Sequence, residues 1–417
     1  MDHRSKDSMR MKKRRKVFKY IKFGFGFALS RNIRRRKRQN KMSRKEETPR
    51  GWSKLCPDVL RKIMQTLSPI DSHMAKLVCL DWFSVWKTCA NRLPCPLRII
   101  HHGGSPDEDK FYMRKTYTSY YGTRNRVSYD YKTNLASNFE GKHCMASCGS
   151  WLLMVEYCSH FHLLNLFTLK RIELPSIESR IGSWNWKNSA LVWINETTGD
   201  YVVAFLVSQH KLFSHKKGSR SWWSLEPSGP DSGFLDVAYK NSKLYVLTTD
   251  QHIKTFDFSG VSPREENRYR NLVFRFDEQP WEYIWKRKIA IDESGKVLLI
   301  LSLKEVNYDE EKLLFYVFKL NVERCKWERV YSIGDNEMLI FGHGVTVRAP
   351  VQDCFGDGTK SGLIHFVEDD VWPDSQEHED RSSDYGVFDI ATSRFEWTKK
   401  SCFYINETQW FVPGVDY

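Results

Sequence analysis

Hydrophobic side chains between residues 51 and 93 recur at the spacing of short amphipathic helices. Val59, Ile63 and Leu67 are four residues apart, and Leu60 and Met64 fall on the same helical face. Such a face has to be buried against another element, so a small helical unit is expected here.

Helix start signals in the same stretch divide it into two or three helices. Pro57 stands where a first helical residue is expected, and Asp58 suits the positive end of the helix dipole. Ser68 followed by Pro69 repeats the start signal. Trp82 closes the apolar pattern on a last helix. About 40 residues is too short for a confident independent core, so this module should complete itself against a partner or the next domain.

The pattern changes after residue 94, where short apolar runs alternate with turns rich in Gly, Asn, Asp and Ser. The runs are four to eight residues long and rich in β-branched and aromatic residues, which predicts strands. The segment 195–200 between two runs predicts a hairpin. The clearest runs are 150–155, 190–194, 201–205, 243–247, 296–301 and 313–318.

A loose internal repeat of strand, polar turn and strand recurs at 163–175, 318–327 and 387–397. Repeated hairpins over about 320 residues favour a β-propeller, because radial blades leave few exposed sheet edges. An ordinary multi-sheet β-domain remains the alternative.

The charge is concentrated at the N-terminus. Residues 1–50 carry 20 Lys and Arg against four Asp and Glu, and the remainder carries 45 basic and 47 acidic residues, so the body is close to neutral. A basic tail does not indicate a nucleic-acid-binding fold, and specific nucleic-acid recognition is not expected. The two clusters are Lys12, Lys13, Arg14, Arg15 and Lys16, and then Arg34, Arg35, Arg36, Lys37 and Arg38.

These clusters leave three interpretations open: a nuclear import signal, a transit peptide or a solvated arm. We expect a disordered tail and a location in the nucleus, the cytoplasm or both. No segment is long enough to span a membrane as a helix, so no stable membrane association is expected. The predicted fold class is α+β multidomain, with the tail at 1–50, an all-α module at 51–93 and a mainly antiparallel all-β domain at 94–417.

The sequence offers no convincing chemistry of its own. Ten cysteines are scattered without a CxxC pair, which suggests free, mostly buried thiols. His143, Cys144 and Cys148, with His160 and His162 downstream, fit no common zinc spacing and look like strand core. We therefore predict no catalytic residues, no metal and no cofactor.

Residues 52–86 resemble the F-box. The resemblance combines a helix start, an apolar spacing and a Val-Cys-x-x-Trp ending, although Cys56 interrupts the usual Leu-Pro pair and Met74 stands where a basic residue is common. It implies docking onto a Skp-type adaptor and, through it, a cullin. The implied adaptor-binding residues are Leu55, Pro57, Asp58, Leu60, Ile63, Leu67, Val78 and Trp82.

The C-terminal part is similar to plant F-box proteins that carry the domain of unknown function 295, a predicted β-propeller. The segments that carry this likeness are 333–342, 362–370, 386–390 and 409–413. The resemblance implies a non-catalytic substrate receptor of an SCF-type ubiquitin ligase, with an unknown protein substrate. Two other hypotheses stay open: an interaction protein acting through the basic arm in the nucleus or on nucleic acid, and a degenerate F-box protein uncoupled from a ligase.

Overall fold

The computed structural model describes the chain from Leu55 to Phe411, with gaps. Both basic clusters lie outside the described residues, as do the predicted boundaries at 50 and 93. The residues outside the description are 1–54, 68, 91–96, 102–110, 116–128, 133–141, 157–158, 178–188, 208, 230–231, 261, 267–273, 275–281, 293, 307–310, 325, 335–336, 343–346, 351–360, 368–370, 372–384, 398–406 and 412–417.

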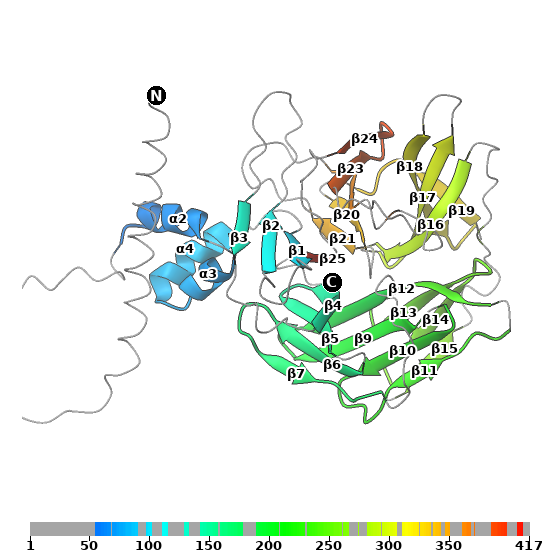
Figure 1. The fold of residues 1–417 in the computed structure, drawn as a ribbon, viewed down its shortest axis with the longest axis horizontal. Coiled ribbons are helices and arrows are strands. Elements are labelled where there is room, and N and C mark those ends of the chain that lie inside the picture. The colour runs from blue at the N-terminus through cyan, green and yellow to red at the C-terminus, as the bar shows by residue number, and fades with distance from the viewer. Residues whose placement is uncertain are drawn as a thin grey trace, which may run out of the picture. The chain divides into compact units, whose positions relative to one another are not determined.

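Three short helices form the predicted helical module: α2 (Pro57–Thr66), α3 (Pro69–Ala75) and α4 (Leu80–Ala90) (Figure 1). Both proline start signals are confirmed, since α2 and α3 begin at Pro57 and Pro69. In the first turn of α2, Arg61 Nη1 donates to Asp58 Oδ1 at 2.7 Å. The core of the module consists of Leu60, Met64, Ala75, Trp82 and Val85.

Five sheets are built from consecutive strands, as the blades of a β-propeller (Figure 1). The first contains β4 (Lys142–Cys148), β5 (Trp151–Glu156), β6 (His160–Asn165) and β7 (Arg171–Glu173). The second contains β8 (Ala190–Asn195), β9 (Asp200–Val207), β10 (Lys211–Lys216) and β11 (Trp223–Leu225). The third contains β12 (Phe234–Lys240), β13 (Lys243–Thr248), β14 (Ile253–Asp257) and β15 (Arg264–Glu266).

The fourth sheet contains β16 (Glu282–Ile291), β17 (Val297–Val306), β18 (Glu311–Asn321) and β19 (Lys326–Val330). The fifth contains β20 (Glu337–Phe341), β21 (Val347–Pro350), β22 (Leu363–Val367), β23 (Tyr385–Asp389) and β24 (Arg394–Trp397). A further sheet is formed by β1 (Leu97–His101), β2 (Phe111–Lys115), β3 (Tyr129–Lys132) and the C-terminal β25 (Glu407–Phe411). The pairing of β25 with β1 joins the two ends of the β-domain in one sheet.

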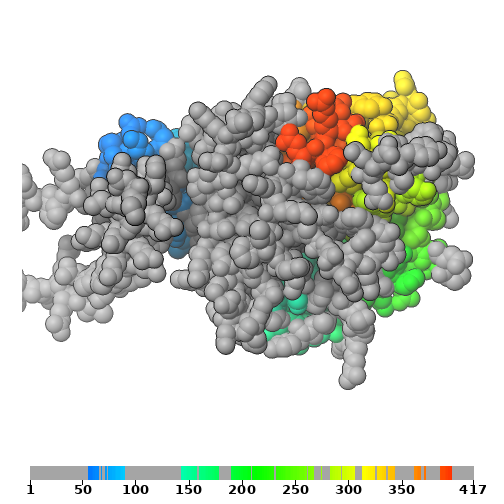
Figure 2. Space-filling view, turned by 45° about the horizontal axis from the view of Figure 1, so that its top comes forward, coloured from blue at the N-terminus to red at the C-terminus, as the bar shows by residue number. Residues whose placement is uncertain are grey.

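The first strands of successive sheets lie side by side. Strand β4 contacts β8, β8 contacts β12, and β12 contacts β16; β25 contacts β4 at one end of this series and β16 contacts β21 at the other. This is the arrangement of propeller blades around an axis. In Figure 2 the surfaces of the third and fourth sheets, green and yellow, adjoin along one side of the molecule. The β-propeller prediction is confirmed, and the alternative of an ordinary multi-sheet domain is not supported.

The internal repeat corresponds to one kind of turn. At the end of the penultimate strand of four blades, an Asn or Asp side chain accepts hydrogen bonds from backbone N–H groups two or three residues later. Asn165, Asp257, Asn321 and Asp389 all act in this way. The predicted hairpin at 195–200 uses the same device through Asn195, and Gly199 there has φ +66°. Local turn chemistry therefore generates the repeat.

The fifth sheet departs from the antiparallel pattern. Its order is β21-β20-β22-β23-β24, and β20 runs parallel to β22. A parallel pair needs a longer connection than a hairpin, and 21 residues separate Phe341 from Leu363. The rest of the described pairing is antiparallel, so the prediction of a mainly antiparallel domain is confirmed.

Aromatic side chains fill the space between blades. Phe161 stacks on Phe205 at 4.9 Å between ring centroids, and Trp222 meets both rings edge-on. Phe315, from β18, packs against rings of the fifth sheet, including Phe366 at 5.0 Å. The high aromatic content of the sequence thus serves the packing of sheet against sheet.

Candidate functional site

The helical module carries an exposed apolar set on its surface. Leu80 is 82% exposed and Leu77 is 68% exposed, and Val59, Met74 and Val78 are between 38% and 44% exposed. We call these five residues the exposed apolar set. Five large apolar side chains left exposed on one short helical unit are a candidate surface for contact with another protein.

The turn between α3 and α4 fixes most of this set. The Leu77 N–H donates to the Met74 carbonyl at 3.1 Å, and the Val78 N–H donates to the Ala75 carbonyl at 3.2 Å. These bonds close the end of α3 and leave Leu77 and Val78 pointing away from the module core. Leu80 follows at the first position of α4.

The eight residues implied by the F-box resemblance occupy three different environments. Leu60 is 0% exposed and Trp82 is 6% exposed, so in this structure both hold the module together. Leu55, Ile63 and Leu67 are partly buried against the same core. Only Pro57, Asp58 and Val78 are exposed. A direct adaptor contact by the buried pair stays a prediction.

The adaptor-binding residues implied by the F-box resemblance leave out Leu77 and Leu80, the two most exposed members of the set, although the sequence pattern places Leu77 on the apolar face of the module. The signal was present: Leu80 precedes Trp82, Val85 and Trp86, which define the buried face of α4, and does not share their spacing. Cys56 and Met74, the two departures from the F-box pattern, are both exposed.

Cations flank the aromatic side of the module. Lys76 Nζ lies 4.5 Å from the centre of the Trp86 ring, and Lys87 Nζ lies 4.6 Å from the Phe83 ring. Phe83 and Trp86 stack at 6.3 Å. Cation–π contacts at exposed positions contribute about 0.5–1 kcal/mol each, so they orient these side chains more than they stabilise the fold.

The propeller contains a buried charged pair between Asp236 on β12 and Lys288 on β16. Lys288 Nζ lies 3.4 Å from Asp236 Oδ1 and donates to Ser189 Oγ at 2.6 Å, and the Ile289 N–H donates to Asp236 Oδ2 at 2.7 Å. Burial raises the pKa of Asp236, and the nearby Lys288 opposes that rise. The pair links two neighbouring blades. Because both side chains are buried, neither is accessible to a substrate.

The histidine and cysteine group considered for zinc is distributed over two strands of the first blade. His143, Cys144 and Cys148 lie on β4, whereas His160 and His162 lie on β6. His162 is buried, and burial lowers its pKa to about 4. Within the described ranges, no three His, Cys, Asp or Glu side chains are grouped as a metal site would require.

None of the described helices has the length and hydropathy needed to cross a bilayer. The predicted nuclear import residues lie outside the described part of the chain.

Comparison with known proteins places both parts of the chain. Residues 52–93 match the F-box domain, and residues 120–389 match the family described as KIB1-4 beta-propeller. A putative F-box protein of Arabidopsis thaliana is 49% identical over 92% of this chain and 98% of its own length. F-box only protein 7 of the same plant is 42% identical over 89% of this chain and 98% of its own length. F-box/kelch-repeat protein KIB1 is 31% identical over 76% of this chain and 80% of its own length.

Among solved structures, an oligogalacturonate lyase from Vibrio parahaemolyticus is similar over 73% of this chain and 80% of that one, with 10% identity and a TM-score of 0.33. A likeness at that level supports no argument about function. The two domain matches and the full-length plant relatives do: the chain belongs to the plant F-box proteins with a KIB1-4 β-propeller.

Proposed function

We propose that this chain is the substrate-recognition subunit of an SCF-type ubiquitin ligase. The helical module docks onto a Skp-type adaptor, which connects it to a cullin, and the propeller presents a target protein for ubiquitination. The observation that supports this proposal is the exposed apolar set on an F-box module, because these side chains lie outside the buried core of that module.

The energy of docking should come chiefly from two leucines. Burying a fully exposed Leu side chain contributes about 1.5–3 kcal/mol, and Leu77 and Leu80 expose most of theirs. Apolar anchors of this kind carry most of the energy of a protein interface, and flanking charges tune its rim. The previously implied contacts Pro57, Asp58 and Val78 lie at the surface and remain available to the same partner.

The role requires no chemistry from this chain. Ubiquitin transfer would be performed by other subunits, and the receptor would supply orientation and effective concentration by holding the target near them. F-box proteins act as adaptor subunits, which agrees with this division of labour. The rigid blades would position loops that recognise the target.

Co-purification with a Skp-type adaptor tests the proposal. We expect the full chain to capture the adaptor and the Leu77→Ala/Leu80→Ala variant to bind it at least tenfold more weakly. The matched control is Leu169→Ala, an exposed leucine of the propeller that is 48% exposed. Circular dichroism checks that each variant keeps its helices.

Absence of adaptor binding by the wild-type chain would identify a degenerate F-box protein and refute the proposal. If the wild type and the double variant bind the adaptor equally well, Leu77 and Leu80 do not contribute to the interface. A Leu55→Ala/Pro57→Ala/Ile63→Ala variant then tests the contacts implied by the F-box pattern.

A second function is favoured by one observation, the excess of 16 positive charges in residues 1–50. We infer that this arm directs the chain to the nucleus or makes loose contacts with polyanions. Fusion of residues 1–50 to a fluorescent protein tests nuclear import. Salt-sensitive nucleic-acid binding that is lost on deletion of the arm would support the polyanion role.

A further inference from the structure

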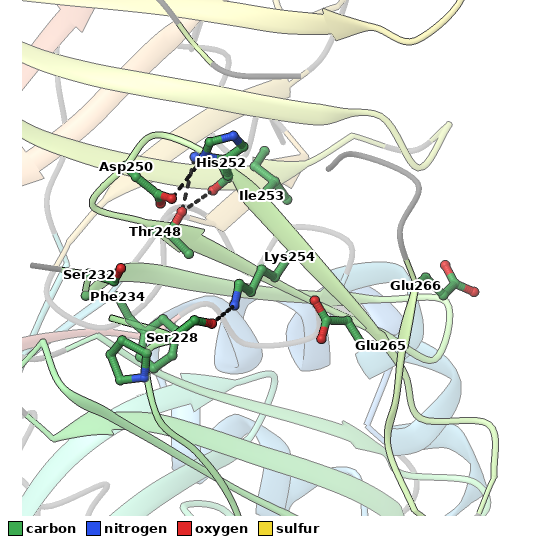
Figure 3. A pocket seen from close by; sticks show the side chains of 12 residues that line it. Ser228, Ser232, Phe234, Thr248, Asp250, His252, Ile253, Lys254, Glu265 and Glu266 are labelled. Carbon is green, nitrogen blue, oxygen red and sulfur yellow. Dashed lines mark hydrogen bonds and ion pairs between the residues drawn. The ribbon is translucent and has the colours of Figure 1, made fainter. Parts of the chain in front are cut away.

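A groove of about 610 Å³ lies beside the third blade of the propeller. One wall comes from Ser228, in the chain between β11 and β12, and from Phe234 at the start of β12. The other comes from β14, β15 and the turn before β14 (Figure 3). The volume falls within the range of ligand pockets, but the lining is mostly polar. Nothing in the proposed function so far uses this groove.

Hydrogen bonds hold the walls of the groove in a fixed shape. Thr248 Oγ1 donates to the His252 carbonyl at 3.0 Å and accepts from the His252 N–H at 3.1 Å. The Gly233 N–H donates to Thr249 Oγ1 at 2.8 Å. A Cβ at Gly233 would lie 3.0 Å from the Gln209 carbonyl oxygen, so the close approach of the walls favours glycine. The groove is therefore preorganised.

Backbone strain in the turn between β13 and β14, beside the groove, also indicates a functional site. Gln251, at the tip of the turn between β13 and β14, has φ +66°, which a side chain other than glycine or asparagine rarely adopts. Backbone strain of this kind costs of order 1–3 kcal/mol and clusters at functional sites.

The charges in the groove are not matched to one another. Glu266 is neutralised by Lys243, whose Nζ lies 2.7 Å from Glu266 Oε2, and Asp250 Oδ2 lies 3.2 Å from His252 Nδ1. The exposed side chain of Glu265, in contrast, has no hydrogen bond or ion pair to any residue that the structure describes.

Lys254 does not satisfy Glu265, although the two side chains share one face of the sheet. Strand pairing sets Glu265 opposite Phe256, two residues beyond Lys254. Lys254 Nζ instead donates to Ser228 Oγ across the groove at 3.2 Å, as Figure 3 shows. The groove therefore offers one free carboxylate next to an ammonium group that has only a neutral partner.

We propose that this groove binds a short basic segment of the target protein, with an arginine or lysine side chain on Glu265. The inference rests on the proposed function and names the class of its substrate. An arginine forms two parallel charge-assisted bonds with a carboxylate, and the Asp250 carboxylate, which also lines the groove, adds negative potential around it. The Lys254 ammonium group and the Ser228 hydroxyl are placed to bind carbonyl oxygens of the peptide backbone. A nucleic acid would be repelled by the same carboxylates.

Fluorescence anisotropy of the full-length chain with labelled decapeptides tests this inference. The probe alternates arginine and serine, and a second peptide alternates glutamate and serine. We expect the arginine peptide to bind and the glutamate peptide not to bind. Glu265→Gln should weaken binding of the arginine peptide about tenfold, which corresponds to about 1.4 kcal/mol.

The matched control is Glu323→Gln, an exposed glutamate in the turn between β18 and β19, away from the groove. It should leave the affinity unchanged. No binding of the arginine peptide, equal losses in the two variants, or preferential binding of the glutamate peptide would overturn the inference.

Adaptor capture separates this inference from the proposed function. Glu265→Gln should bind the adaptor as the wild type does. If the wild-type chain binds the arginine peptide but does not capture the adaptor, only the ligase role is refuted. If the wild-type chain captures the adaptor but does not bind the arginine peptide, only the proposed substrate class is refuted.

Discussion

Gly386 on β23 stands directly opposite Phe366 on β22, and the two are packed so closely that alanine should not fit. A Cβ at Gly386 would lie 2.3 Å from Phe366 Cζ and 2.6 Å from its Cε2, whereas ordinary contacts are 3.4–4 Å. The ring would have to move by about 1 Å. It is fully buried and packed against Phe315, so it has no free space to move into.

We expect Gly386→Ala to destabilise the propeller by about 1–3 kcal/mol, the usual cost of overpacking a core. Alanine also lowers the backbone entropy of the unfolded chain, which offsets about 0.4–1 kcal/mol of this cost, so a net loss of about 1–1.5 kcal/mol is expected. Urea unfolding followed by tryptophan fluorescence should show an earlier midpoint. The control is Gly260→Ala, where the nearest atom to the new Cβ is the Ser262 carbonyl oxygen at 3.7 Å.

A double variant separates steric overlap from other causes. Phe366→Leu removes the ring atoms that the alanine would meet, so Gly386→Ala should cost much less in that background. A Gly386→Ala midpoint equal to the wild type, or strictly additive losses in the double variant, would contradict the steric argument.

Two further predictions concern buried ionisable groups. Burial lowers the pKa of His365 to about 4, below its ordinary value of 6.5, so the unfolded chain takes up the proton first as the pH falls. Between pH 7 and pH 5 this histidine should cost the fold about 2 kcal/mol, and His365→Leu should lose that much less stability over the same interval in urea titrations. A pH dependence identical to the wild type would contradict it. Asp236→Asn leaves the Lys288 ammonium group buried without its carboxylate and should cost on the order of 3–5 kcal/mol in thermal unfolding. Adding Lys288→Met should recover much of that loss; no recovery would show that the pair is not the cause.

The helix starts and the turns of the chain could be predicted because each depends on residues that are neighbours in the sequence. A proline fixes its own φ, so Pro57 and Pro69 begin helices wherever the module lies. An Asn or Asp side chain caps its own turn, so the repeat at Asn165, Asn321 and Asp389 was visible without any knowledge of the blades. Alternation of apolar runs and turns then favoured a propeller.

Tertiary structure decided which side chains face a partner. Apolar residues of the helical module look alike in the sequence, but Leu60 and Trp82 fill its core whereas Leu77 and Leu80 lie outside it. Helical periodicity gives a direction around one helix axis, and only the packing of three helices shows which directions remain open.

Long-range pairing was equally invisible in the sequence. Asp236 meets Lys288 across 52 residues, β25 pairs with β1 across the whole β-domain, and Glu265 faces the groove without a partner. Each depends on strands that come together only when the chain has folded. The sequence by itself determined the elements and their turns, because those interactions are local. The docking surface and the groove were decided by tertiary structure, because burial and charge pairing depend on what the rest of the chain brings close.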